Sequence, residues 1–383
     1  MVRTDDNLRA RRWVDLTARQ IGDPVQRLRF LQAVAPRPGS TWKSRKTVGV
    51  MGLVVLLAAG GIVSFQSMRA DNRISPPART RAHYASIRVE QPTRIWQVEK
   101  TEAYESYSNG LRIENQYSVS HRPRVYRVFA TGQPEDTRGE MRSSPAGIVF
   151  HTTESLQAPF EPSQNSVLKQ VGESLLEYVR RHRCYNFVID RFGRVFVVRE
   201  SDAADHAGHS VWADDTWSYV NLNDSFLGVS FEAQTLSGQL EAHVNPAQLR
   251  GAAMLTEMLR DRYQIPAGNC VTHAQVSVNP TNMQIGYHND WASSFPFEQL
   301  GLPDNYGKPV PAVWRFGFEY DSSFERSAGA RLYQGAQLAG DEVRERAAAL
   351  HLKIDAYRNT LQKSYWGMVE GSARGAVAAA ETD

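Results

Sequence analysis

The sequence predicts an α/β fold in which a mixed central β-sheet is flanked by helices, with one N-terminal transmembrane helix and a helical C-terminal tail. Three observations lead to this prediction. Apolar runs of strand length alternate with amphipathic helical segments between residues 91 and 302. A long uncharged run lies near the N-terminus. A heptad-like apolar pattern lies near the C-terminus.

The composition is that of a folded protein and does not indicate nucleic acid as a partner. Of the 383 residues, 42% are hydrophobic and 22% are charged, which excludes a wholly disordered or collagen-like chain. The formal net charge of +3 lacks the strong basic field typical of nucleic-acid-binding proteins. The two cysteines, Cys184 and Cys270, are too few for a disulfide scaffold, and either one bridge or two free thiols fits the sequence.

The N-terminal part of the chain has the features of a membrane anchor. Residues 47–65 contain no charge and, at about 1.5 Å per helical residue, approach the roughly 30 Å thickness of a bilayer core. The run is longer than the apolar part of a signal peptide and follows a long segment, so we expect a retained single-pass helix. In residues 1–46, Lys and Arg outnumber Asp and Glu by 11 to 4, which favours a cytoplasmic location for this segment. The body of the protein is then expected outside the cytoplasmic membrane, in the periplasm.

Residues 66–90 mix Pro, Arg and Ser with little apolar periodicity, as in a juxtamembrane linker. The folded body is expected over 91–302. It opens with segments rich in Val, Tyr and Ile, QVEKTEAYESYSNGLRI and PRVYRVFAT, which predict strands. The short apolar run GIVF before His151 predicts a buried strand, as does FLGVSFEA further on.

Two helices and a hairpin are predicted within this body. Helical spacing in SVLKQVGESLLEYVRRH places on one face Val167, Val171, Leu175 and Tyr178. The segment YNFVIDRFGRVFVVRE predicts a hairpin, with Gly193 available for a positive φ angle in its turn. A second helix is expected to begin at Asn245 and Pro246, because a capping residue followed by proline is typical of a helix start. The segment VTHAQV predicts a last strand.

Histidines at the ends of predicted strands form a candidate metal site. His151 ends the run GIVF, and His273 follows the apolar residues of a second strand. His288 and Asp290 are two residues apart, so in an extended segment both side chains point the same way. Two histidines and a carboxylate are the three protein ligands of a catalytic zinc site, which keeps a fourth position for water. Spacing alone leaves open whether Asp290 or His288 supplies the third ligand.

Seven segments of the body, in order, resemble the type 2 N-acetylmuramoyl-L-alanine amidases. This zinc amidase fold is shared with peptidoglycan recognition proteins and bacteriophage amidase lysozymes. The segments are GIVFHTTES, CYNFVIDRFGRVFVVRE, DHAGHS, LGVSFEAQT, NPAQLRGAAMLTEMLRDRYQIP, VTHAQV and DWASSFPFEQL, and they span about 145–302. The resemblance implies a mixed sheet flanked by helices and one zinc ion. It also implies hydrolysis of the amide between N-acetylmuramic acid and L-alanine in peptidoglycan or muropeptides.

The resemblance assigns roles to individual residues. It makes His151, His273 and Asp290 the zinc ligands, because DWASSFPFEQL aligns Asp290 with the family's third ligand. It places Tyr185 and His288 at catalytic positions, where His288 replaces the lysine that the family usually has. As a hypothesis, these two groups stabilise the oxyanion and deliver a proton to the departing nitrogen.

Three further residues are expected at the substrate. His206 lies in the tripeptide His-Ala-Gly that matches a substrate-groove element of the family. Ser230 stands where one branch has a glutamate base, and Glu232, two residues on, is a reserve candidate for that base. The residues found at His288 and Ser230 keep a second function open, a recognition module that binds peptidoglycan without cutting it.

The resemblance ends beyond residue 303. The C-terminal segment 303–383 instead contains a heptad seam formed by Val343, Ala347, Leu350, Ile354, Tyr357 and Leu361. This pattern predicts a helix that packs on the amidase domain or on a partner, with self-association as the alternative.

Overall fold

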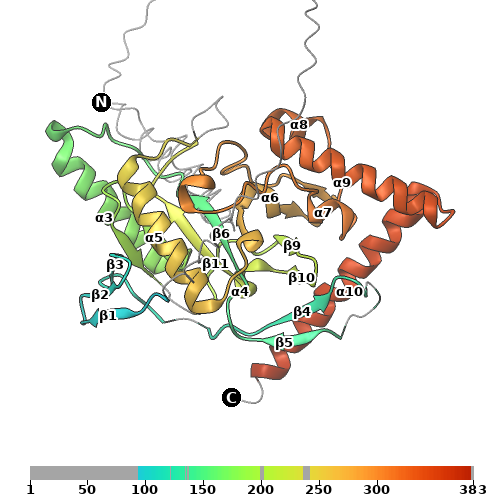
Figure 1. Ribbon diagram of the computed structural model, residues 1–383, viewed down its shortest axis with the longest axis horizontal. Coiled ribbons are helices and arrows are strands. Elements are labelled where there is room, and N and C mark those ends of the chain that lie inside the picture. Colours follow the sequence, from blue (N-terminus) through green and yellow to red (C-terminus); the bar gives the residue numbers. More distant parts are fainter. Residues whose placement is uncertain are drawn as a thin grey trace, which may run out of the picture. The chain divides into compact units, whose positions relative to one another are not determined.

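A computed structural model describes residues 94–120, 122–133, 135, 138–198, 202–235 and 242–380, which form one compact unit (Figure 1). The predicted cytoplasmic segment, transmembrane helix and linker lie outside the described residues. Among the helices that are described, none combines the length and the apolar character needed to cross a bilayer.

An eight-stranded mixed sheet forms the centre of the fold, in the order β1-β2-β3-β8-β7-β11-β6-β12. The strands are β1 (Gln97–Lys100), β2 (Tyr104–Tyr107), β3 (Arg112–Glu114), β6 (Gly147–Thr152), β7 (Phe187–Ile189), β8 (Val195–Val197), β11 (Phe226–Phe231) and β12 (Cys270–Thr272). Strands β7, β11, β6 and β12 are mutually parallel, whereas β7–β8, β1–β2 and β2–β3 are antiparallel pairs. The predicted mixed sheet is confirmed.

Two smaller sheets accompany the central one. The first is antiparallel, in the order β5-β4-β10-β9, and contains β4 (Tyr126–Ala130), β5 (Glu140–Arg142), β9 (Val211–Ala213) and β10 (Trp217–Val220). The second is a ribbon of β13 (Val278–Asn279) and β14 (Gln284–Ile285).

Helices α3 (Asn165–His182) and α5 (Pro246–Tyr263) cover opposite faces of the central sheet (Figure 1). Side chains alternate between the two faces of a strand. In β7, Phe187 and Ile189 accordingly share a core cluster with α5, while Val188 shares one with α3. The predicted flanking of the sheet by helices is therefore confirmed.

Local signals place the start of α5 and the hairpin where the sequence predicted them. The Asn245 side chain accepts hydrogen bonds from the backbone N–H groups of Ala247 and Gln248, and Pro246 occupies the first turn. Gly193 has a φ angle of +79° in the turn between β7 and β8.

Two local predictions were wrong in detail. The buried stripe of α3 is Leu168, Leu175, Leu176 and Val179, whereas Val167 is 41% exposed. The stripe is therefore offset by one residue from the predicted face over the first turn. The segment VTHAQV is a strand only as far as Thr272, after which His273–Val276 form the short helix α6.

The remaining short elements connect these parts. They are the 3₁₀ turns η1 (Pro162–Gln164), η2 (Ala267–Asn269) and η3 (Glu298–Leu300), and helices α4 (Leu222–Ser225), α7 (Pro311–Trp314) and α8 (Ser322–Ser327).

The C-terminal extension ends in two helices, α9 (Ala330–Ala349) and α10 (Ile354–Ala380), which meet at a sharp angle (Figure 1). The predicted continuous seam was wrong, because a turn over 350–353 divides it and leaves Leu350 58% exposed. Helix α10 packs on the body of the protein. Arg315, which follows α7, donates to Ser218 of β10 and to Ser364 of α10.

Candidate active site

The parallel strands bring the predicted metal ligands together at one edge of the sheet. His151 lies near the end of β6, and His273 directly follows β12, the neighbour of β6. Asp290 lies in the loop after β14. The possible ligand atoms of these three residues all lie within 4.8 Å of one another, and each residue is at most 4% exposed.

Buried aromatic packing fixes the loop that carries Asp290. The next residue, Trp291, is 1% exposed and packs edge-to-face on Phe231 and Phe295. Its carbonyl accepts a hydrogen bond of 2.5 Å from Tyr306, in the C-terminal extension. The extension therefore stabilises the position of a predicted ligand.

Burial and neighbouring charges determine the protonation of this cluster. Burial lowers the pKa of His151 to about 4 and that of His206 well below its ordinary value, so both rings are neutral at pH 7. Burial alone would raise the pKa of Asp290. The His273 imidazole outweighs it and holds that pKa well below its usual range, so the carboxylate is ionised.

Hydrogen bonds determine which nitrogen of each neutral ring carries the proton. His206 Nε2 lies 3.2 Å from the Phe226 carbonyl oxygen, which only accepts, so Nε2 carries the hydrogen. His206 Nδ1 must then accept from His151 Nε2, 3.0 Å away. His151 Nδ1 is left with a lone pair that faces Asp290 Oδ2 at 3.2 Å. Two acceptors thus face each other without a proton, an arrangement that a bound cation would stabilise.

The dimensions of the cluster suit zinc. His273 Nδ1 lies 2.9 Å from Asp290 Oδ1, and His151 Nδ1 lies 3.2 Å from Oδ2. Two atoms that each bind a tetrahedral zinc ion at about 2.0–2.1 Å are about 3.3 Å apart. Two imidazoles and one carboxylate are also a donor set that zinc accepts readily. The residues present therefore fit a zinc ion.

The structure places His206 against a metal ligand. His206 lines the cavity that contains the ligands, its ring contacts His151, and Asn223 Oδ1 accepts from its backbone N–H at 2.7 Å. Gly228 makes room for the ring, because a Cβ atom there would lie 2.6 Å from His206 Cγ. Arg124, 3% exposed, donates to the Phe226 carbonyl that His206 also contacts. These neighbours hold the ring in one orientation.

Tyr185 and His288 both line the cavity that contains the ligands, which has a volume of about 450 Å³. The Tyr185 ring centroid lies 5.1 Å from that of His151, and burial raises the pKa of the phenol well above its ordinary value. His288 stacks on His273 with centroids 4.4 Å apart, and its backbone N–H donates to Ser277. Tyr185 is thus a permanent hydrogen-bond donor beside the metal cluster.

Three residues that line this cavity or adjoin its lining have unusual backbone conformations. Glu154, Tyr185 and Trp291 have φ angles of 50°, 40° and 58°, in the left-handed region that disfavours residues other than glycine. Such conformations are costly and persist mainly where the surrounding structure holds a functional site in place.

Ser230 and Glu232 do not line this cavity, although the sequence predicted both at the substrate. Ser230 pairs with His151 in the parallel ladder but is fully buried. Glu232 follows the end of β11 and accepts from the Arg191 backbone N–H at 3.1 Å. A Cβ atom at Gly172 of α3 would lie 3.7 Å from the Glu232 carboxylate, so that carboxylate faces the helix.

Sequence reasoning missed Glu154, which lines the cavity three residues after His151. Its carboxylate accepts from Thr152 Oγ1 at 2.6 Å and from the Thr235 backbone N–H at 3.1 Å. The available signal was the polar run that directly follows a buried strand.

The two cysteines are both buried and are not joined by a disulfide. Burial raises the pKa of Cys270 to about 12, so its thiol stays protonated and unreactive.

The fold and the His-His-Asp cluster together define a candidate metal-dependent hydrolase. Residues 141–290 match the family model described as N-acetylmuramoyl-L-alanine amidase, which confirms the resemblance found in the sequence. This segment contains both histidines and the aspartate of the cluster. The family match supports an amidase that acts on peptidoglycan.

Several solved structures resemble the chain at low identity. AmiD from E. coli, in complex with the substrate anhydro-N-acetylmuramic acid-L-Ala-D-gamma-Glu-L-Lys, is 18% identical, with 70% of this chain and 98% of that chain covered and a TM-score of 0.34. LysC from Clostridium intestinale URNW is 22% identical, with 41% of this chain and 83% of that chain covered and a TM-score of 0.25. AMPDH3 from Pseudomonas aeruginosa, in complex with anhydromuramic pentapeptide, is 18% identical, with coverages of 60% and 91% and a TM-score of 0.30. Comparison with curated proteins gave no match.

Proposed function

We propose that the protein is a zinc-dependent N-acetylmuramoyl-L-alanine amidase that hydrolyses the amide between N-acetylmuramic acid and L-alanine in peptidoglycan or its fragments. The observation that carries this proposal is the buried cluster of His151, His273 and Asp290. Two of its acceptor atoms, His151 Nδ1 and Asp290 Oδ2, face each other across 3.2 Å in a way that a cation would stabilise. The family match over 141–290 supplies the substrate class.

Each residue of the site has a distinct task in this proposal. A zinc ion held by the cluster would polarise the scissile carbonyl and lower the pKa of a bound water to about 7. Tyr185 stays protonated because burial raises its pKa, so the phenol donates a hydrogen bond to the oxygen that gains negative charge. His288, at the cavity wall, transfers a proton to the departing L-alanine nitrogen.

The amide reaction balances with water as the co-reactant. Water adds to the carbonyl carbon and the carbon–nitrogen bond breaks. The muramic acid keeps a carboxylate, and the stem peptide leaves with a free L-alanine amine. Glu154 lines the same cavity. In this proposal its carboxylate accepts the proton that the attacking water loses.

Zinc stoichiometry and turnover in single variants test these assignments. We expect Asp290→Ala to lose both zinc and hydrolysis, and His288→Ala to keep zinc while losing turnover. His209→Ala, in the same cavity wall, serves as the matched control and should keep both. Loss of zinc from His288→Ala with zinc retained by Asp290→Ala would make His288 the third ligand instead.

The alternative function, a recognition module that binds peptidoglycan without cutting it, rests on one observation. Ser230 is fully buried and supplies no base at the position where part of the family has a glutamate. Zinc-loaded wild-type protein that binds peptidoglycan and releases no stem peptide would favour this module over the amidase.

We propose further that the chain is a single-pass membrane protein with its catalytic domain in the periplasm. The uncharged run 47–65 and the excess of Lys and Arg in residues 1–46 support this topology. Fusion of alkaline phosphatase to the C-terminus of the full chain tests it. We expect an active phosphatase, whereas a silent phosphatase beside a fluorescent cytoplasmic reporter fusion would contradict the proposed orientation.

A further inference from the structure

A second cavity, of about 870 Å³, lies at the other end of β6 from the metal cluster. Ala146, just before β6, lines this second cavity, while His151 lines the first. Four residues of extended strand lie between them, so the path covers five residue steps and roughly 16 Å. The second cavity is therefore distinct from the candidate active site.

The C-terminal extension supplies one wall of this cavity. Its lining includes residues from β4, β5, β9 and β10 on one side. On the other side it includes Lys308, Trp314 and Arg346, which lie beyond the segment 141–290 that matches the amidase family. The extension thus forms part of a pocket that lies partly outside the family match.

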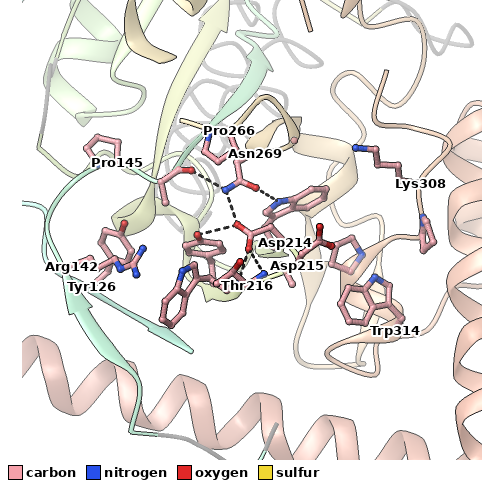
Figure 2. A pocket seen from close by; sticks show the side chains of 18 of the residues that line it. Tyr126, Arg142, Pro145, Asp214, Asp215, Thr216, Pro266, Asn269, Lys308 and Trp314 are labelled. Atoms are coloured by element: carbon pink, nitrogen blue, oxygen red, sulfur yellow. Dashed lines mark hydrogen bonds between the residues drawn. The ribbon is translucent and has the colours of Figure 1, made fainter. Parts of the chain in front are cut away.

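Each wall of the pocket carries an indole ring with an arginine guanidinium close to it. Figure 2 shows Tyr126 and Arg142 on one side of the pocket and Lys308 and Trp314 on the other. The Arg142 guanidinium lies 4.3 Å from the ring centroid of Trp217, and that of Arg346 lies 5.2 Å from Trp314. Both indoles are half-buried, so part of each remains available to a ligand. The exposed part of each indole is apolar surface of the kind on which sugar rings pack.

The floor of the pocket is hydrogen-bonded within the protein. Asn269, 1% exposed, accepts from Trp212 Nε1 at 3.0 Å and donates to Asp214 at 2.9 Å (Figure 2). Asp214 also accepts from the backbone N–H groups of Thr216 and Trp217. Because these groups are already satisfied, the floor is a preorganised scaffold.

The groups left for a ligand are of both signs. Arg142 pairs with Glu140 at 3.1 Å. Lys308 is exposed, and no ion-pair partner is found for it among the described residues. Asp215, exposed between the two walls in Figure 2, offers a carboxylate to hydroxyl donors. A ligand that matches this pocket has apolar ring faces for the two indoles, hydroxyl groups for Asp215 and a carboxylate for Lys308.

We propose that this second cavity binds an acidic glycan strand, with sugar rings on Trp217 and Trp314 and a carboxylate at Lys308. The identification of that strand as peptidoglycan rests on the proposed function. Two kinds of strand carry the required carboxylate. In a peptide-bearing strand it belongs to the stem peptide, and in a denuded strand it is the lactyl carboxylate that amide hydrolysis leaves on muramic acid.

Binding measurements on the full chain in detergent test this proposal. The variants are Trp314→Ala and Lys308→Ala, and the matched controls are Trp366→Ala, 43% exposed on α10, and Lys169→Ala on α3. The probes are purified peptide-bearing sacculi and denuded glycan strands. We expect Trp314→Ala to weaken binding about tenfold and Lys308→Ala to weaken it several-fold, with both controls at wild-type affinity.

Hydrolysis of a small soluble muramoyl peptide separates this proposal from the proposed function. Both cavity variants should hydrolyse the fragment within about twofold of the wild-type rate, because the lining of the second cavity contains none of the proposed catalytic residues.

Wild-type affinity of both variants for both probes would overturn the glycan site. Inactivity of the wild type on both the fragment and the sacculi would instead overturn the amidase. The probe whose affinity falls more identifies the preferred strand. Lys308 is exposed, so its variant also serves if Trp314→Ala fails to fold.

Discussion

Replacement of His206 by leucine tests whether this ring acts on the metal cluster or on the substrate. In the structure His206 Nδ1 accepts from His151 Nε2 at 3.0 Å, which leaves the other nitrogen of His151 free to bind a metal. Leucine fills a similar volume but has no acceptor. Its introduction leaves a buried N–H of His151 without a partner and frees the ring to rotate or to change tautomer.

The magnitude follows from that single lost contact. A buried donor left without a partner costs about 1–3 kcal/mol. Loss of the group that orients a metal-binding histidine commonly weakens metal affinity about 10- to 100-fold. Because a tenfold change corresponds to about 1.4 kcal/mol, these two figures agree. We therefore expect His206→Leu to raise the Kd for zinc by about 10- to 100-fold.

Competition with a fluorescent zinc chelator measures this Kd without reference to activity. His206→Gln should recover part of the affinity, because its amide oxygen can accept from His151. His209→Gln is the control, since His209 lines the same cavity and is exposed. Wild-type zinc affinity in His206→Leu, together with a raised KM for muropeptide, would refute the positioning role and restore the substrate-binding role that the sequence predicted.

Three further predictions concern the surroundings of the site. Gly228→Ala places a methyl group against the His206 ring. Urea titration should show that the free energy of unfolding falls by about 1–3 kcal/mol. An unchanged free energy would mean that Gly228 does not confine the ring. Burial raises the pKa of Glu232 from 4.5 to about 7, so between these pH values only the folded state holds the proton and stability falls as pH rises. The free energy of unfolding of Glu232→Gln should therefore rise, relative to that of the wild type, by up to roughly 3 kcal/mol as the pH increases from 4 to 8. A difference that does not change with pH would contradict the raised pKa of Glu232. Phe318→Ala removes a fully buried ring whose centroid lies 5.0 Å from that of Tyr365 in α10. The same titration should show that the free energy of unfolding falls by about 3–5 kcal/mol. A near-neutral effect would show that α10 contributes little to stability.

Local signals in the sequence predicted much of the fold. The cap at Asn245, the turn at Gly193 and the apolar runs of β6 and β11 each act over a few residues, so the chain reveals them without tertiary contacts. The heptad seam failed for the opposite reason. No glycine or proline marks the turn at 350–353, and His351 adopts a positive φ angle of 55° there.

The site was predicted less completely, because its details depend on distant partners. The strand-end positions of His151 and His273 are visible in the sequence. The partner of His206 lies 55 positions away in the sequence, so no local pattern reveals that contact. Glu232 was a candidate because it lies two residues after Ser230, but β11 ends at Phe231, so the alternation of side chains along the strand does not extend to Glu232.

The second cavity could not have been predicted from the sequence. Trp217 belongs to the amidase-like body, whereas Trp314 and Lys308 belong to the C-terminal extension. Only tertiary packing brings the three residues around one pocket. The extension carries no recognised motif, so its contribution became visible only in the structure.

Mass spectrometry of the products tests the central claim most directly. The full chain in detergent is incubated with peptidoglycan as purified, after treatment with a chelator, and after zinc is added back. The proposed amidase releases free stem peptides that begin with L-alanine, loses this activity with the chelator and recovers it with zinc. Intact strands with uncleaved stem peptides in the zinc-loaded sample, despite stable binding, would contradict it.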